Sequence, residues 1–123
     1  MNESIATRHI LAPVDLGDGS RSALRYVRFL AKSCGARVTI FYAHGVDDET
    51  EADLDADQVK DLEGAVRSYV APFFEDLRYD VIVASGDPAV AVPRTARVIG
   101  ADLIVMGTLG RKGAERAVAG VFA

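Results

Sequence analysis

Apolar residues along the chain fall into two patterns: short continuous runs, and runs in which they recur every three or four positions. The continuous runs have the length of buried strands and occur four times, at 9–14, 37–43, 79–84 and 102–106. The spaced pattern is typical of helices that bury one face, and it occurs three times, over 20–34, 55–77 and 88–99. This alternating order predicts one α/β domain over residues 1–123, a doubly wound parallel sheet with helices on both faces.

Residues with defined roles at helix ends support these boundaries. Ser20 is expected to cap the first helix with its hydroxyl, and Gly35 is expected to end it in a left-handed conformation. Pro72 lacks an N–H group and is expected to kink or break the second helix. Asp87 and Pro88 supply an N-cap and a first-turn proline for the third helix.

Composition narrows the classes of partner. The net charge is −4, and half of the acidic residues fall in 47–63, which predicts a solvated loop and helix start. We find no basic stripe to bind nucleic acid, and no apolar stretch of the roughly 18–20 residues that a membrane span needs. Cys34 is the only cysteine, so we expect no internal disulfide and a cytoplasmic location. Cys34 also continues the apolar face of the first helix and is expected to be buried.

Three common kinds of site are disfavoured by the motifs. His9 and His44 are not accompanied by a cluster of cysteines or histidines, so we expect no metal site. The stretch GDGSRS (17–22) stands where a dinucleotide-binding G-x-G-x-x-G would be, but its third glycine is replaced by Ser22. No G-x-x-x-x-G-K-[ST] loop for phosphoryl transfer occurs, and we assign no catalytic residue.

The residues that follow each strand are the candidates for binding, because open α/β sheets bind ligands beyond the carboxyl ends of their strands. Asp15 follows the first strand, Ala43 ends the second, and Gly107 follows the fourth. A glycine-rich segment leaving a strand lets backbone N–H groups approach a phosphate, and Arg111 and Lys112 add two cations there. The alternative, that these glycines only form a turn and a cap, remains open at this stage.

Four stretches of the chain match a known family. They are ILAPVD (10–15), VTIFYAH (38–44), SGDPAVAV (85–92) and GADLIVMGTLGR (100–111). Gly107, Gly110 and Gly120 also keep the spacing G-x-x-G, nine residues, then Gly. On these residues the chain resembles the universal stress protein family, from residue 9 to the last.

The resemblance implies a universal-stress-protein-like fold, also described as adenine nucleotide alpha hydrolase-like, with strand order 3-2-1-4-5. In ATP-binding members the nucleotide lies across the ends of strands 1, 2 and 4. By this resemblance Asp15 would approach the adenine or the ribose, and Ala43 would offer backbone hydrogen bonds to the adenine edge. Met106 and Gly107 would line the base and the ribose.

The phosphates, by the same resemblance, would meet the glycine-rich segment. Gly110 would give them room, and Gly120, Val121 and Phe122 would supply N–H groups to them. Val121 departs from ATP-binding members, which have Ser or Thr at this position. The missing hydroxyl removes a hydrogen bond to a charged phosphate worth about 1.5–3 kcal/mol, so ATP or another adenine nucleotide is expected to bind weakly.

The end of the sequence is the second departure. Family members continue with a helix and a fifth strand, so the resemblance is to a C-terminally truncated member. The strand at 102–106 would then be an uncovered sheet edge, which natural proteins normally protect. We therefore expect a homo-oligomer, a dimer, that pairs near this strand or through the C-terminal loop.

The function implied by the resemblance is that of a cytoplasmic regulatory or protective protein of the stress response. It would bind an adenine nucleotide, and any ATP hydrolysis would be slow and incidental, so we do not expect an enzyme. The alternative is an interaction module of the same fold that binds no nucleotide and acts through dimerisation. Val121 and the short C-terminus favour this alternative, whereas Asp15, Gly107 and Gly110 favour nucleotide binding.

Overall fold

The computed structural model of the chain describes residues 7–44, 54–109 and 115–121. Its helices are α1 (Arg21–Cys34), α2 (Ala56–Val70) and α3 (Pro88–Ile99), with the short 3-10 turns η1 (Asp18–Ser20) and η2 (Ala71–Phe73). Its strands are β1 (His9–Pro13), β2 (Arg37–His44), β3 (Asp80–Ser85), β4 (Leu103–Leu109) and β5 (Glu115–Val121). The predicted alternation of strands and helices is confirmed, as is the α/β fold class.

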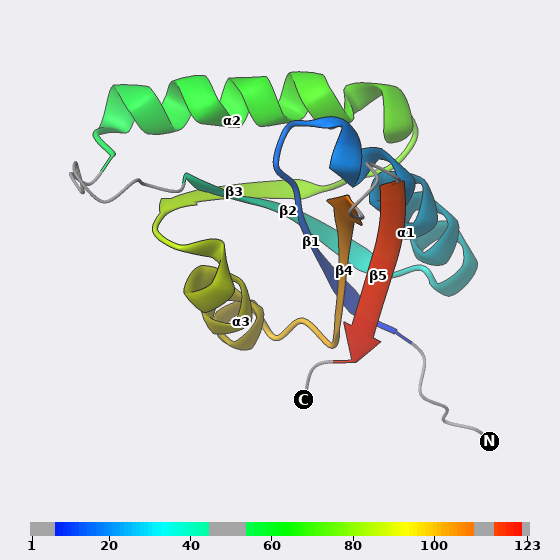
Figure 1. Ribbon diagram of the computed structural model, residues 1–123. Coiled ribbons are helices and arrows are strands. Elements are labelled where there is room, and N and C mark those ends of the chain that lie inside the picture. The colour runs from blue at the N-terminus through cyan, green and yellow to red at the C-terminus, as the bar shows by residue number, and fades with distance from the viewer. Residues whose placement is uncertain (1–6, 45–53, 110–114, 122–123) are drawn as a thin grey trace.

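The sheet has the order β3-β2-β1-β4-β5 (Figure 1). The first four strands in this order are parallel, and β1 pairs with β2 from His9 opposite Arg37 to Pro13 opposite Phe41. The parallel order 3-2-1-4 agrees with the sheet implied by the resemblance. It brings the carboxyl ends of β1, β2 and β4 to one edge of the sheet.

β5 overturns one expectation from the sequence, that β4 is a sheet edge. Residues 115–121 run antiparallel to β4 along its whole length, from Glu115 opposite Leu109 to Val121 opposite Leu103. The backbone of this segment pairs with the groups that β4 would otherwise leave open. The glycine-rich segment is therefore partly a strand.

Each face of the sheet is covered by different helices. On β1, Ile10 and Ala12 belong to the larger core cluster, which also contains apolar residues of α1 and α2. Leu11, between them, belongs to a second cluster with residues of α3. This alternation follows from the two-residue period of a strand, and it gives the three layers seen in Figure 1.

The helix ends follow the sequence signals with one exception. Gly35 ends α1 with a φ of 68°, and Asp87 caps α3 by accepting a hydrogen bond of 3.0 Å from the N–H of Ala89. The long helix stops at Val70, and Pro72 lies in the η2 turn that follows. Ser20 precedes α1 as predicted, but its hydroxyl does not cap the helix. The hydroxyl is instead engaged by Asp15, which lies five residues earlier.

Cys34 is exposed, so its expected burial was wrong. The buried stripe of α1 ends at Ala31, and Cys34 occupies the final position of the helix.

Arg28 and Lys32, both on α1, each place a nitrogen 2.6 Å from a carboxylate oxygen of Asp76. These hydrogen bonds hold the pKa of Asp76 well below its usual range and join α1 to the segment after η2.

None of the helices within the described ranges combines the length and the apolar character that crossing a bilayer would require.

Candidate ligand site at the carboxyl ends of the strands

A pocket of about 280 Å³ opens where β1, β2 and β4 end. Four residues predicted from the sequence line it together: Asp15, Ala43, Met106 and Gly107. They lie up to 92 positions apart in the chain, and the parallel order of the sheet is what unites them. The structure thus brings together the base and ribose half of the predicted site.

The walls of this pocket are mainly apolar. Three buried side chains line it: Val14 just after β1, Phe41 on β2 and Val92 on α3. Pro88 lines it one helical turn before Val92, so both residues present the same face of α3. Asp15 is the one charged residue among the described residues that line the pocket. Such a site suits a flat, largely apolar group with a few polar edges.

Asp15 is held in place by the loop that follows it. Its Oδ1 accepts hydrogen bonds of 2.9 Å from both the N–H of Gly17 and the hydroxyl of Ser20. The Ser20 hydroxyl oxygen in turn accepts a hydrogen bond of 3.1 Å from the N–H of Asp15. Leu16, between these groups, has a φ of 64°, a left-handed conformation that the surrounding bonds stabilise. Within the described part of the chain, Oδ2 of Asp15 makes no comparable bond and is available to a ligand.

Gly107 has a packing role that sequence reasoning missed. A Cβ atom at this position would lie 1.7 Å from the carbonyl oxygen of Gly19 and 2.7 Å from its carbon. The η1 turn therefore rests directly on the backbone of β4, which only a glycine permits here. Tyr69 of α2 also donates a hydrogen bond from its hydroxyl to the carbonyl of Gly17. The loop over residues 16–20 is thus clamped between β4 and α2 beside the pocket.

Two residues of the predicted phosphate half, Gly120 and Val121, lie away from the base half. Gly120 lies opposite Ile104 and Val121 opposite Leu103, near the start of β4. Gly107 is three to four residues further along β4, a separation of about 10–13 Å at the rise of a strand. The reason is that β5 returns antiparallel, which carries its last residues to the other end of the sheet (Figure 1). Gly110 and Phe122 lie outside the described residues, as do Arg111 and Lys112.

Some lining residues were not predicted from the sequence. The sequence position of Ser20 predicts a helix cap, but its spacing from Asp15 also suits a hydrogen bond across the loop. Pro88 and Val92 were interpreted only as helix residues. The signal that would have found them is the position of α3, which begins just after β3 at the same edge of the sheet.

Neither histidine lines this pocket. His9 is buried, and its Nε2 lies 2.8 Å from the hydroxyl of Thr39 on β2. Burial, followed by the nearby positive charge of Arg37, lowers the pKa of His9. Nδ1 of His44 is buried and has no hydrogen-bond partner in the described part of the chain. The described residues contain no group of three or more His, Cys, Asp or Glu side chains that would hold a metal ion.

Comparison with solved structures supports the fold. A universal stress protein solved in complex with cAMP has 20% identity and a TM-score of 0.66, over 81% of this chain and 75% of that one. A protein of the universal stress protein family from Burkholderia pseudomallei has 26% identity and a TM-score of 0.64, over 86% and 85% of the two chains. A universal stress protein from Lactobacillus plantarum has 23% identity and a TM-score of 0.63, over 92% and 85%.

Comparison by sequence gives the family directly. A search of curated proteins returned no match. The model of the universal stress protein family matches residues 6–123, which is nearly the whole chain. The match agrees with the strand order of the sheet. The chain belongs to the universal stress protein family.

Proposed function

We propose that this chain is a regulatory or protective protein of the stress response that binds an adenine nucleotide weakly, without robust turnover. The observation that carries the proposal is the meeting of Asp15, Ala43, Met106 and Gly107 in one pocket. A structural neighbour solved with cAMP supports an adenine nucleotide as the class of ligand. The cytoplasm is the compartment that we propose, on the single cysteine of the sequence.

The shape and chemistry of the pocket favour the adenosine part of the nucleotide. Its volume of about 280 Å³ lies just below the roughly 300–1,000 Å³ of small-molecule sites. Val14, Phe41 and Met106 offer apolar surface to the base, and the backbone of Ala43 offers hydrogen bonds to its edge. The carboxylate of Asp15 would accept hydrogen bonds from ribose hydroxyls through Oδ2. The phosphates would extend out of the pocket.

The hydrogen bonds of Asp15 favour a role in binding over a role in catalysis. Its Oδ1 is occupied in holding the loop over residues 16–20, so proton transfer by this carboxyl would disturb the loop. Its negative charge also gives no stabilisation to phosphates that pass near it. We therefore expect adenosine, AMP and ATP to bind with similar, modest affinities and any hydrolysis to be slow.

The test is a ligand titration that compares the parent with an Asp15→Asn variant. Asparagine keeps an oxygen to accept from Gly17 and Ser20 but removes the charge that favours ribose hydroxyls. A hydrogen bond to a charged group contributes about 1.5–3 kcal/mol, so the Kd for AMP should rise roughly ten- to a hundredfold. Asp61→Asn on the exposed surface of α2 removes the same charge away from the pocket and should leave the Kd unchanged. Equal losses in both variants would contradict the proposed role of Asp15.

The second candidate function is an interaction module of the same fold that acts as a dimer without nucleotide. The observation in its favour is that Gly120 and Val121 lie near the start of β4, away from the pocket. If millimolar adenosine, AMP and ATP all fail to raise the Tm, this second function is the one supported. A monomeric mass by light scattering at micromolar concentration would count against the dimer on which it depends.

A further inference from the structure

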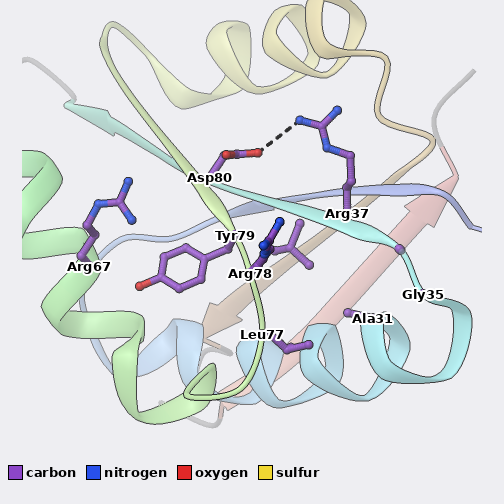
Figure 2. Close-up of a pocket in the computed structure, with 10 residues that line it drawn as sticks. Ala31, Gly35, Arg37, Arg67, Leu77, Arg78, Tyr79 and Asp80 are labelled. Carbon is purple, nitrogen blue, oxygen red and sulfur yellow. Dashed lines mark hydrogen bonds and ion pairs between the residues drawn. The ribbon is translucent and has the colours of Figure 1, made fainter.

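A second hollow lies at the opposite edge of the sheet, where β2 and β3 begin, and its volume is about 760 Å³ (Figure 2). Arg37 contributes from the start of β2, Arg67 from the last turn of α2, and Arg78 from the segment just before β3. We refer to this hollow as the arginine pocket. The three arginines come from separate segments of the chain, and the fold places all of them in the lining of one hollow.

Two of the three guanidinium groups are held by neighbours within the arginine pocket. Nη2 of Arg37 lies 3.2 Å from Oδ2 of Asp80, the ion pair drawn in Figure 2. Cζ of Arg67 lies 5.6 Å from the centre of the Tyr79 ring, a distance at which a cation and an aromatic face attract. Arg78 is exposed and makes no hydrogen bond or ion pair within the described part of the chain. Fixed guanidinium groups lose less conformational entropy when they bind a ligand.

The charges in the arginine pocket do not cancel. Three arginines face one carboxylate, that of Asp80, among the described lining residues. This local excess of positive charge occurs in a chain whose net charge is −4. The ion pair between Arg37 and Asp80 is itself solvent-exposed and stabilises little. A lining with more cations than carboxylates favours an anion over a cation or a neutral ligand.

The size and the lining of the arginine pocket suit a ligand larger than an inorganic ion. The hollow is larger than a single phosphate requires, and part of its wall is apolar, from Ala31, Val38 and Leu77. The Tyr79 ring, half-buried beneath Arg67, adds an aromatic surface. Guanidinium groups bind phosphate oxygens in pairs of parallel hydrogen bonds, which matches them to phosphate better than to a single point charge.

We propose that the arginine pocket binds a small organic molecule that carries phosphate, with its phosphate on Arg78 and Arg67 and its organic part against Tyr79 and Leu77. This site is separate from the adenosine pocket. Arg37 begins β2 and Ala43 lies six residues further along the same strand, about 20 Å away at the rise of a strand. The two sites are therefore able to be filled at the same time.

The first experiment titrates the full chain with inorganic pyrophosphate by calorimetry at low ionic strength. Arg78→Gln should weaken binding about tenfold or more, because it removes a charge-assisted pair of hydrogen bonds. Arg94→Gln removes the same charge from an exposed position on α3 and should leave the Kd unchanged. No binding by the parent at millimolar pyrophosphate, or equal losses in the two variants, would overturn the proposal.

A second variant changes affinity in the other direction. Asp80→Asn removes the one carboxylate among the described lining residues, which repels an anion, so pyrophosphate should bind several-fold more tightly than to the parent. Asp61→Asn is the matched control and should give no change. Weaker or unchanged binding by Asp80→Asn would show that the charge of the arginine pocket does not act on the ligand and would contradict the site as described.

A third comparison tests the organic part of the ligand. Phenyl phosphate should bind more tightly than inorganic phosphate, because its ring contacts Tyr79 and Leu77. The Asp15→Asn variant, changed at the other edge of the sheet, should bind both probes as the parent does. Equal affinity for phenyl phosphate and inorganic phosphate would remove the organic part from the proposal.

Discussion

The two ends of the parallel strands carry side chains of opposite charge. At the carboxyl ends of the strands, the pocket is apolar and its described charge is the carboxylate of Asp15. At the amino ends, the arginine pocket collects three guanidinium groups. In such a fold the helices begin near the carboxyl ends of the strands, so their dipoles place partial positive charge there and partial negative charge at the other edge. The side chains of this protein carry the opposite sign at each edge: a carboxylate at the carboxyl ends and guanidinium groups at the amino ends.

The position of one of the three arginines is explained by the stability of its own helix. Arg67 lies in the last turn of α2, where a cation interacts favourably with the helix dipole whether or not a ligand is present. Arg37 and Arg78 lie outside helices, so the same explanation does not cover them. The comparison teaches that the backbone alone does not decide which edge attracts an anion. Side chains supplied from separate segments set the local charge.

The largest effect is expected from a substitution at the carboxyl edge, Gly107→Ala. The added Cβ would overlap the carbonyl oxygen of Gly19, and neither backbone can move without lifting the η1 turn from β4. We expect a loss of about 3 kcal/mol or more in the free energy of unfolding, measured by chemical denaturation. Nucleotide affinity should fall as well, because the displaced loop carries Ser20, which holds Asp15.

Gly64→Ala provides the matched control for this prediction. Gly64 lies within α2, and a Cβ there would meet nothing within 4 Å. The same chemical change should stabilise the protein by about 0.5–1 kcal/mol, because alanine favours a helix over the unfolded chain. If Gly107→Ala were tolerated as well as Gly64→Ala, the contact between η1 and β4 would be wrong.

A smaller effect on the free energy of unfolding is expected at the amino edge, from the titration of His9. Burial and the charge of Arg37 lower the pKa of His9 in the folded state, so the unfolded chain binds a proton more readily. Stability is therefore retained above the unfolded pKa of about 6.5 and lost as the pH falls from there toward the folded value. The slope is at most about 1.4 kcal/mol per pH unit, the effect of one proton.

His9→Gln tests this dependence because glutamine retains a group able to hydrogen-bond with Thr39 but does not titrate. Between pH 7.5 and 5.5, the parent should lose more stability than the variant in denaturation experiments. A variant that loses stability as steeply as the parent over this range would assign the pH dependence to other groups.

The parts of the fold that local pattern controls were predicted from the sequence. Gly35 and Asp87 marked helix ends because each acts through its own backbone or its neighbours. Asp15, Ala43 and Gly107 could be placed in one pocket because parallel strands bring their carboxyl ends to one edge. These predictions needed no knowledge of individual side-chain contacts.

Features that depend on contacts between distant residues were not predicted. The strand over 115–121 exists through its pairing with β4, and its glycine favoured a loop when it was considered alone. Ser20 had two local partners available, the helix N-terminus and Asp15, and spacing did not decide between them. The arginine pocket joins residues 37, 67 and 78, whose proximity no local pattern contains.

The measurement that tests the central claim most directly is an amide chemical-shift titration of the parent protein with adenosine. The account predicts that the shifts concentrate on residues of the carboxyl edge, Val14, Asp15, Ala43 and Gly107, and leave Val38 and Tyr79 at the amino edge unchanged. Shifts confined to the amino edge, or none up to millimolar adenosine, would contradict it.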